Sequence, residues 1–216
     1  MIVITAPTGN IGHQVLANVL AGDEPVRVIV RDPARLPASV RNRVEVIQGS
    51  HGDPRVAAHA LAGADALFWL LPTDNQAASV EAAYVGFTRP AAEAIREQGV
   101  KRVVDVSALG RHTSYARRAG HVTGSLAMDD LIASTGVAFR ALTAPSFMDN
   151  MLRQVRDQFT GHGISDAMAQ GMLDMMIAKD NGLDNGVGRG PGNAIDTPTT
   201  FRQWCADTLK PAVQAA

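Results

Sequence analysis

The chain has 216 residues, of which 46% are hydrophobic and 19% are charged, and its formal net charge is −1 at pH 7. This composition is typical of a globular protein with a sizeable core. It lacks the basic excess of nucleic-acid and anionic-lipid binders, so neither partner is expected. The single cysteine, Cys205, excludes an internal disulfide, and no apolar run reaches the roughly 18 residues of a membrane span.

Short runs of Val, Ile and Leu alternate with helical patterns up to Pro145. Such runs predict strands buried on both faces, and their alternation with helices predicts a Rossmann-like, doubly wound parallel α/β sheet. The predicted strands are residues 2–5, 26–30, 44–47, 66–71, 103–106 and 137–142, and the predicted helices are residues 11–20, 54–61, 77–98 and 121–134. Because a strand already starts at Ile2, we expect no signal peptide and a cytoplasmic protein.

After Pro145 the pattern changes, and no further strand is predicted. The spacing of apolar residues predicts helices over residues 147–159, 165–178 and 199–209, and the Gly-, Asn- and Pro-rich residues 181–198 predict a loop. We therefore divide the chain into a Rossmann domain, residues 1–146, and a small, mostly helical C-terminal region, residues 147–216.

The opening stretch MIVITAPTGNIGHQVLANVL reads as strand, tight turn and helix, which is where a Rossmann fold holds a dinucleotide phosphate. A phosphate there needs backbone N–H donors and the positive end of a helix dipole. The candidate donors are Thr8, Gly9, Asn10, Ile11 and Gly12. A glycine-rich turn that binds nothing is the alternative interpretation.

Ala6 stands where the first glycine of such a turn is usual. Because a residue before proline favours the extended region, we expect Ala6 to be extended and the turn to be made at Pro7–Thr8. Pro7 itself offers no N–H to a phosphate.

The end of the second predicted strand, VRVIVRDPARLP, bears on which dinucleotide is bound. An NAD-preferring fold places an acidic residue there, whereas Arg31 suits the 2′-phosphate of NADP, with Arg35 as support. NADP is therefore the favoured cofactor, with NAD as the alternative. Asp32 competes as a ribose ligand, but Asp32–Pro33 also has the pattern of a helix N-cap. Arg31 as a solvated surface charge is the competing interpretation.

Five segments in this order resemble the NmrA-like atypical short-chain dehydrogenases/reductases. They are VITAPTGNIG, VRVIVRDPARL, ADALFWLLP, VKRVVDVSALG and STGVAFRALTAPSFMDN, and TPTTFRQWCADTLKPAV resembles the family's final helix. The resemblance covers about the first 150 residues. It implies an NAD(P)-binding Rossmann domain with a C-terminal substrate region, in a family that includes quinone reductases and redox-sensing regulators.

Position by position, the resemblance implies a set of cofactor contacts. These are Thr8, Gly9, Asn10, Ile11 and Gly12 at the pyrophosphate, Arg31 at the 2′-phosphate, Leu70, Leu71 and Pro72 at the adenine and ribose, Ser107 and Ala108 near the nicotinamide ribose, and Pro145 and Phe147 over the nicotinamide. Three features depart from the family: Ala6, Ser50 where an aspartate near the adenine is common, and a shortened C-terminal region. The shortened region would either leave the nicotinamide rim more open or shift its covering to a partner subunit. We expect residues 49–53 to form a polar loop near the adenine.

Short-chain dehydrogenases pair a catalytic tyrosine with a lysine four residues later, and this chain lacks the pair. Tyr84 is followed at that spacing by Thr88, and Tyr115 by Ala119. Tyr115 and His121 are the candidate proton donors or carbonyl ligands, although each also fits a purely structural role. The histidines show no metal-ligand spacing, so no metal site is expected.

These observations lead to an NADP(H)-dependent oxidoreductase that works without the Tyr/Lys dyad and passes hydride to a small-molecule acceptor such as a quinone. A non-catalytic NAD(P)-sensing regulatory protein is the alternative, and a degenerate scaffold that binds no nucleotide is a third hypothesis. Apolar helices in the C-terminal region also make a homodimer plausible.

Overall fold

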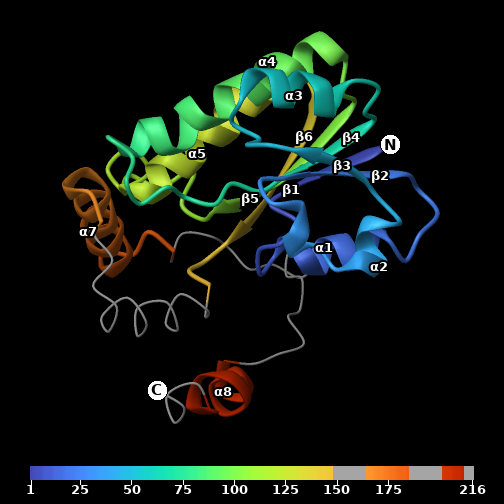
Figure 1. Ribbon diagram of the computed structural model, residues 1–216. Helices are drawn as coiled ribbons and strands as arrows, with labels where there is room; N and C mark the ends of the chain where they lie inside the picture. Colours follow the sequence, from blue (N-terminus) through green and yellow to red (C-terminus); the bar gives the residue numbers. More distant parts are fainter. Residues whose placement is uncertain (148–163, 185–200, 212–216) are drawn as a thin grey trace.

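A computed structural model describes residues 1–147, 164–184 and 201–211, and it contains a six-stranded, entirely parallel sheet (Figure 1). The strand order is β3-β2-β1-β4-β5-β6. The strands are β1 (Ile2–Thr5), β2 (Val26–Val30), β3 (Glu45–Gln48), β4 (Ala66–Trp69), β5 (Arg102–Ala108) and β6 (Ala138–Ala144). The order reverses at β1, so the loops after β1 and β4 diverge over the carboxyl edge. This confirms the predicted doubly wound α/β fold.

Helices cover both faces of the sheet (Figure 1). They are α1 (Gly12–Val19), η1 (Pro33–Arg35), α2 (Ala38–Arg41), α3 (Pro54–Leu61), η2 (Ala82–Gly86), α4 (Phe87–Gln98), α5 (His121–Ala133), α7 (Asp166–Asp180), α8 (Phe201–Trp204) and η3 (Cys205–Leu209). Figure 1 shows α3, α4 and α5 on one face and α1 and α2 on the other. Among these helices, none combines the length and the apolar character needed to cross a membrane.

The two faces of the sheet hold separate apolar cores because successive strand residues point in opposite directions. In β1, Val3 packs with α3, α4 and α5, whereas Ile4 packs on the α1 side with Leu16 and Leu20. Both strand residues are fully buried. Each buried side chain of this size contributes about 1.5–3 kcal/mol, so the central strands anchor the fold.

Most predicted boundaries agree with the structure to within two residues, with one clear difference. The helix predicted over residues 77–98 starts later, because the hydroxyl of Ser79 accepts the amide of Ala82 at 2.9 Å and caps the first turn. The helix then widens at η2 before it continues as α4, which contains Pro90. Residues 70–79 are thereby left as an extended loop over the carboxyl edge.

Part of the predicted C-terminal region is described. The predicted helix over residues 165–178 corresponds to α7, which Ser165 caps, and the described part of the helix predicted over residues 199–209 corresponds to α8 and η3. Residues 181–184 form a turn, as expected for the start of the loop. Residues 148–159 and 185–198, predicted as helix and loop, lie outside the described residues.

Two glycines bring α7 against the start of α5. Gly120 has φ of +50°, and a Cβ added there would lie 1.8 Å from the carbonyl oxygen of Gly171 in α7. A Cβ on Gly171 would lie 2.5 Å from a methyl group of Val80. Backbone therefore meets backbone at this crossing, and a larger residue at position 120 cannot be accommodated without moving α7.

We expect Gly120→Ala to lower stability by about 3 kcal/mol or more and to expose α7 to protease, because the new methyl group displaces that helix. Gly99→Ala is the matched control, since Gly99 also has positive φ, +67°, but has open space around it. The control should cost only about 1–2 kcal/mol from backbone strain. Thermal unfolding and limited proteolysis compare the two, and equal losses would contradict the collision.

Candidate functional site

The loop between β1 and α1 forms a tight turn whose first residue is Ala6. The amide of Gly9 donates to the carbonyl oxygen of Ala6 at 3.1 Å, and Ala6 has φ of +47°. A Cβ on Gly12 would lie 2.0 Å from the same oxygen. Gly12 is therefore required for α1 to start directly under the turn.

The expectation that Ala6 is extended is wrong. Its carbonyl oxygen accepts the Gly9 amide, which closes a turn with Pro7 and Thr8 as its central residues, so the predicted position of the turn is confirmed. A left-handed conformation costs a non-glycine residue about 1–2 kcal/mol. The preference of a pre-proline residue for extended geometry is thus overridden by the hydrogen bond that closes the loop.

The turn leaves a row of backbone donors at the start of α1. The Gly9 amide is used within the turn, whereas the amides of Thr8, Asn10, Ile11 and Gly12 have no partner among the described residues. Ile11, the N-cap residue of α1, offers no side-chain cap. Free N–H groups and the helix dipole together fit a phosphate.

The end of β2 carries two free guanidinium groups. Arg31 and Arg35 are both exposed, and neither side chain has an ion-pair or hydrogen-bond partner in the part of the chain that the structure describes. Asp32 instead accepts the amide of Ala34 at 3.0 Å and caps η1, followed by Pro33. The N-cap interpretation of Asp32 is confirmed, and Asp32 does not neutralise the positive charge of Arg31 through an ion pair.

The loop after β3 is less polar than expected because His51 is buried. Its ring lies 5.0 Å from the Trp69 ring and 4.8 Å from the Phe87 ring, centroid to centroid, in edge-on geometry. Burial and the nearby positive charge of Arg31 lower the pKa of His51 to about 4. His51 is therefore a neutral packing residue at pH 7. The effect of Arg31 on its pKa indicates that the Arg31 charge lies near this loop.

The end of β4 is held against β1 by one hydroxyl. Thr5 Oγ1 accepts the amide of Leu70 at 2.7 Å and donates to the Leu70 carbonyl at 2.9 Å. Leu70 and Leu71 are half-buried, and Pro72 is exposed. Residues 70–72 directly follow β4, and Arg31 directly follows β2. Because β2 and β4 flank β1 in the parallel sheet, residues 70–72 and Arg31 lie along the carboxyl edge on either side of the β1–α1 loop.

A buried polar cluster lies behind the end of β5. Ser107 donates its hydroxyl to Asp129 Oδ2 at 2.7 Å and lies 3.2 Å from the hydroxyl of Ser125. Arg111, in the loop after β5, donates to the same Asp129 oxygen at 2.9 Å and pairs with exposed Asp130. Ser125 and Asp129 are four residues apart on α5 and so share the face that packs on β5.

Asp105 completes this cluster and was not recognised in the sequence. It is fully buried two residues before Ser107, and neither of its carboxyl oxygens has a partner; Asp129 Oδ1 also lacks one. Burial and the negative charge of Asp129 raise the pKa of Asp105 to about 8. Asp105 therefore carries its proton at pH 7, which allows it to donate to Asp129.

A second polar chain crosses the same rim. The Tyr84 hydroxyl lies 3.2 Å from the Thr73 hydroxyl and 3.5 Å from His121 Nδ1, and His121 Nε2 lies 3.0 Å from the carbonyl oxygen of Met168. Burial raises the pKa of Tyr84. Both ring nitrogens of His121 are thus bound by other groups of the protein. The tyrosine in contact with His121 is Tyr84, which has no lysine four residues later, and not Tyr115.

The remaining candidates have different surroundings. Tyr115 is half-buried and packs against the apolar cluster of Ala119, Val122 and Leu126, apart from the groups that bind His121. Ala108 is half-buried, and Pro145 and Phe147 are exposed. Within the described ranges, no group of three His, Cys, Asp or Glu side chains is placed to hold a metal ion.

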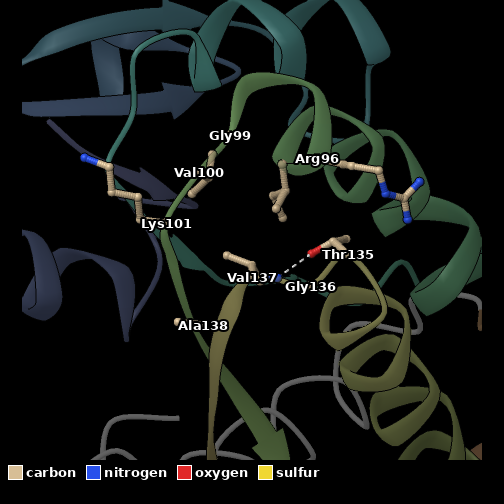
Figure 2. Close-up of a pocket in the computed structure, with 9 residues that line it drawn as sticks. Arg96, Gly99, Val100, Lys101, Thr135, Gly136, Val137 and Ala138 are labelled. Atoms are coloured by element: carbon tan, nitrogen blue, oxygen red, sulfur yellow. Dashed lines mark hydrogen bonds between the residues drawn. The ribbon is translucent and has the colours of Figure 1, made fainter.

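A shallow hollow lies at the opposite, amino edge of the sheet (Figure 2). It is lined by residues of the loops that lead into β5 and β6, including Gly99, Lys101, Gly136 and Ala138. None of the candidate residues contributes to it. The candidate site is therefore the row of loops along the carboxyl edge and not this hollow.

Comparison with known proteins identifies the family of the chain. A family model described as NAD(P)H-binding matches residues 7–167. An NADPH-dependent quinone oxidoreductase from Escherichia coli, solved with NADPH, has a TM-score of 0.59 and 24% identity over 72% of this chain and 53% of its own. Triphenylmethane reductase from Citrobacter sp., solved with NADP(H), has a TM-score of 0.59 and 16% identity over 82% of this chain and 64% of its own.

One curated relative shares more sequence over a shorter stretch. The (4-alkanoyl-5-oxo-2,5-dihydrofuran-3-yl)methyl phosphate reductase of Streptomyces griseus is 42% identical over 89 residues, which are 38% of this chain and 30% of that protein. The chain thus matches less than two thirds of the length of each of these relatives. The family match and the fold confirm the resemblance to NmrA-like short-chain dehydrogenases/reductases stated from the sequence.

We expect Asp105→Asn to stabilise the protein increasingly as pH rises. The raised pKa of Asp105 means that the folded chain binds a proton that the unfolded chain loses, so the stability contributed by Asp105 falls between about pH 4 and pH 8. The asparagine variant lacks this loss, and the stability difference should grow by up to about 1.4 kcal/mol per pH unit in that window.

Thermal unfolding of both proteins from pH 4 to pH 9 measures this difference. The lowered pKa of His51 produces an opposite slope as pH falls below 6.5, but it is common to both proteins and cancels. Asp23→Asn, at an exposed loop position, is the matched control and should show no such trend. A stability difference that does not vary with pH would refute the buried, protonated state of Asp105.

Proposed function

Because the chain belongs to the NAD(P)H-binding family, we propose that it binds NADPH along the carboxyl edge of the sheet and passes hydride to a small acceptor such as a quinone. The observation that carries this proposal is the row of unpartnered amides at Thr8, Asn10, Ile11 and Gly12, with the unpaired guanidinium of Arg31 one strand away. The amides fit a pyrophosphate and the guanidinium fits the further phosphate that distinguishes NADP from NAD.

The other contacts follow the course of a dinucleotide across the sheet. Leu70, Leu71 and Pro72 would line the adenine and its ribose, with Arg35 supporting Arg31 at the 2′-phosphate. Ser107 and Ala108 would lie near the nicotinamide ribose, and Pro145 and Phe147 over the nicotinamide. This assignment is supported by the strand order, which sets the β1 and β4 loops side by side at the switch point, with the end of β5 next in line.

Hydride transfer to a quinone asks little acid-base chemistry of the protein, because bound NADPH supplies the hydride. The missing Tyr/Lys dyad argues against ordinary carbonyl reduction but not against this reaction. Support comes from three similar proteins whose names specify reduction of a small molecule. They are the quinone oxidoreductase of E. coli, the triphenylmethane reductase of Citrobacter and the dihydrofuranyl-methyl phosphate reductase of Streptomyces. Tyr115 and His121 stay candidates for contact with the acceptor.

A non-catalytic NAD(P) sensor is the second candidate function. One observation favours it: His121 has both ring nitrogens bound within the protein. The C-terminal region, residues 147–216, would then serve a partner contact rather than an acceptor. The two functions share the same cofactor site and differ only in turnover.

Arg31→Asp should weaken NADPH binding by 100-fold or more and NADH binding by less than 3-fold, because only NADPH presents a phosphate to this position. Calorimetric titration with both cofactors measures the two affinities. Arg89→Asp, at an exposed position on α4, is the matched charge reversal and should change neither. Equal weakening of both cofactors by Arg31→Asp would contradict the assignment of Arg31.

Turnover separates the enzyme from the sensor. We expect NADPH absorbance to decay on addition of a quinone such as menadione, at a rate that saturates with quinone concentration. Tight NADPH binding without oxidation by any of a panel of benzoquinones and naphthoquinones would reject the enzyme and leave the sensor. Absence of binding by either cofactor would favour the scaffold that binds no nucleotide.

A further inference from the structure

We propose that Asp105 and Asp129 share one exchangeable proton behind Ser107 and that Ser107 passes this proton to the reduced acceptor. This inference rests on the proposed function, since it assigns the source of the proton that a reduction consumes. From the sequence alone, Tyr115 and His121 were the candidate proton donors. The structure points instead to a hydrogen-bonded path that starts inside the sheet and ends at the carboxyl edge.

The charges of the cluster require a proton. Asp105 and Asp129 are 0% and 1% exposed, and Arg111 is the cation that pairs with Asp129. Two carboxylates and one guanidinium leave one negative charge, which burial strongly disfavours. One added proton makes the buried cluster neutral. The other neighbour of Arg111, Asp130, is exposed and is screened by water.

The unpartnered oxygens locate that proton. Asp129 Oδ2 already accepts from Ser107 and Arg111, so Asp129 Oδ1 is its remaining acceptor. Both oxygens of Asp105 are buried without a partner. A proton on Asp105 that is donated to Asp129 Oδ1 satisfies an oxygen on each side, and buried polar groups are rarely left unsatisfied.

The path leads outward through Ser107. Asp105 lies two residues deeper in β5 than Ser107, a distance of about 7 Å along a strand. Asp129 would connect the two: its Oδ2 is 2.7 Å from the Ser107 hydroxyl, and its unpartnered Oδ1 is free to accept the Asp105 proton. Ser107 is the member of this path nearest the end of β5, where the proposed nicotinamide ribose lies.

The proton balance of the reaction closes. One hydride added to a quinone gives a hydroquinone anion, which needs one proton on oxygen. Asp129 first takes the proton of Asp105 on Oδ1. Its carboxyl group then turns to present that proton to Ser107, and the Ser107 O–H bond breaks toward the quinone oxygen as Ser107 takes the proton from Asp129. Asp105 is left as a carboxylate and recovers its proton from solvent after product leaves.

The surroundings of Asp105 set the pH range in which it acts. The charged groups that face it are Asp129 from α5 and Arg111 from the loop after β5; its strand neighbours, Trp69 of β4 and Ala141 of β6, are uncharged. Asp129 and burial favour the protonated acid, and Arg111 opposes it. A donor that keeps its proton up to about pH 8 is matched to catalysis near neutrality.

The test is steady-state turnover of the full chain with NADPH and menadione from pH 6 to pH 10. The kcat of wild type should fall above about pH 8. The kcat of Asp105→Asn should be at least tenfold lower than that of wild type at pH 7 and should not fall further above pH 8. The affinity of this variant for NADPH should stay within twofold of the wild-type value. Asp105→Glu should restore part of kcat and the pH dependence. Asp130→Asn, which removes the exposed partner of Arg111, is the matched control and should leave kcat unchanged.

Infrared titration gives a readout without turnover. Wild type should show the carbonyl band of a protonated carboxylic acid that disappears near pH 8, and Asp105→Asn should lack it. Absence of this band in wild type, or normal turnover with an unchanged pH profile in Asp105→Asn, would overturn the relay while leaving the proposed function intact. Lack of turnover in wild type would overturn the proposed function and the relay together.

Discussion

The carbonyl of Ala6 decides the shape of the candidate site. By accepting the Gly9 amide it closes the loop after β1, and by approaching position 12 it excludes any residue larger than glycine from the start of α1. The amides that remain free all lie at the positive end of that helix. The backbone strain at Ala6 is thus stored where the proposed cofactor would bind, as is common at functional sites.

The fold could be predicted because β1, β2 and β4 are apolar on both faces, a pattern that specifies a parallel sheet almost independently of tertiary detail. The turn at Pro7–Thr8 could be predicted as well, but the positive φ of Ala6 could not, because it depends on a hydrogen bond that outweighs the local preference of the pre-proline residue. The pairing of Asp105 with Asp129 also depends on the docking of α5 on β5. The sequence nevertheless contains a signal for this pair: an aspartate within the apolar run VVDV is expected to be buried and so to need a polar partner.

Polar residues in this chain serve packing as well as chemistry, and residue type alone does not distinguish the two. His51 is a neutral ring wedged between Trp69 and Phe87, and His121 joins the Tyr84 hydroxyl to the backbone of α7. Asp105, in contrast, is buried with no partner for either oxygen. Completeness of hydrogen bonding therefore separates His121 from the carboxyl pair to which we assign a reactive proton, whereas His51, whose Nε2 lacks a partner, is recognised as structural by its aromatic packing.

The contact between Gly120 and Gly171 constrains the two positions unequally. A side chain at position 120 would collide with the backbone of α7, so that position must stay glycine while α7 keeps its place. A side chain at position 171 would meet a methyl group of Val80 instead, and a smaller residue at position 80 would relieve that contact. Evolution can therefore remodel this crossing from the α7 side but not from the α5 side.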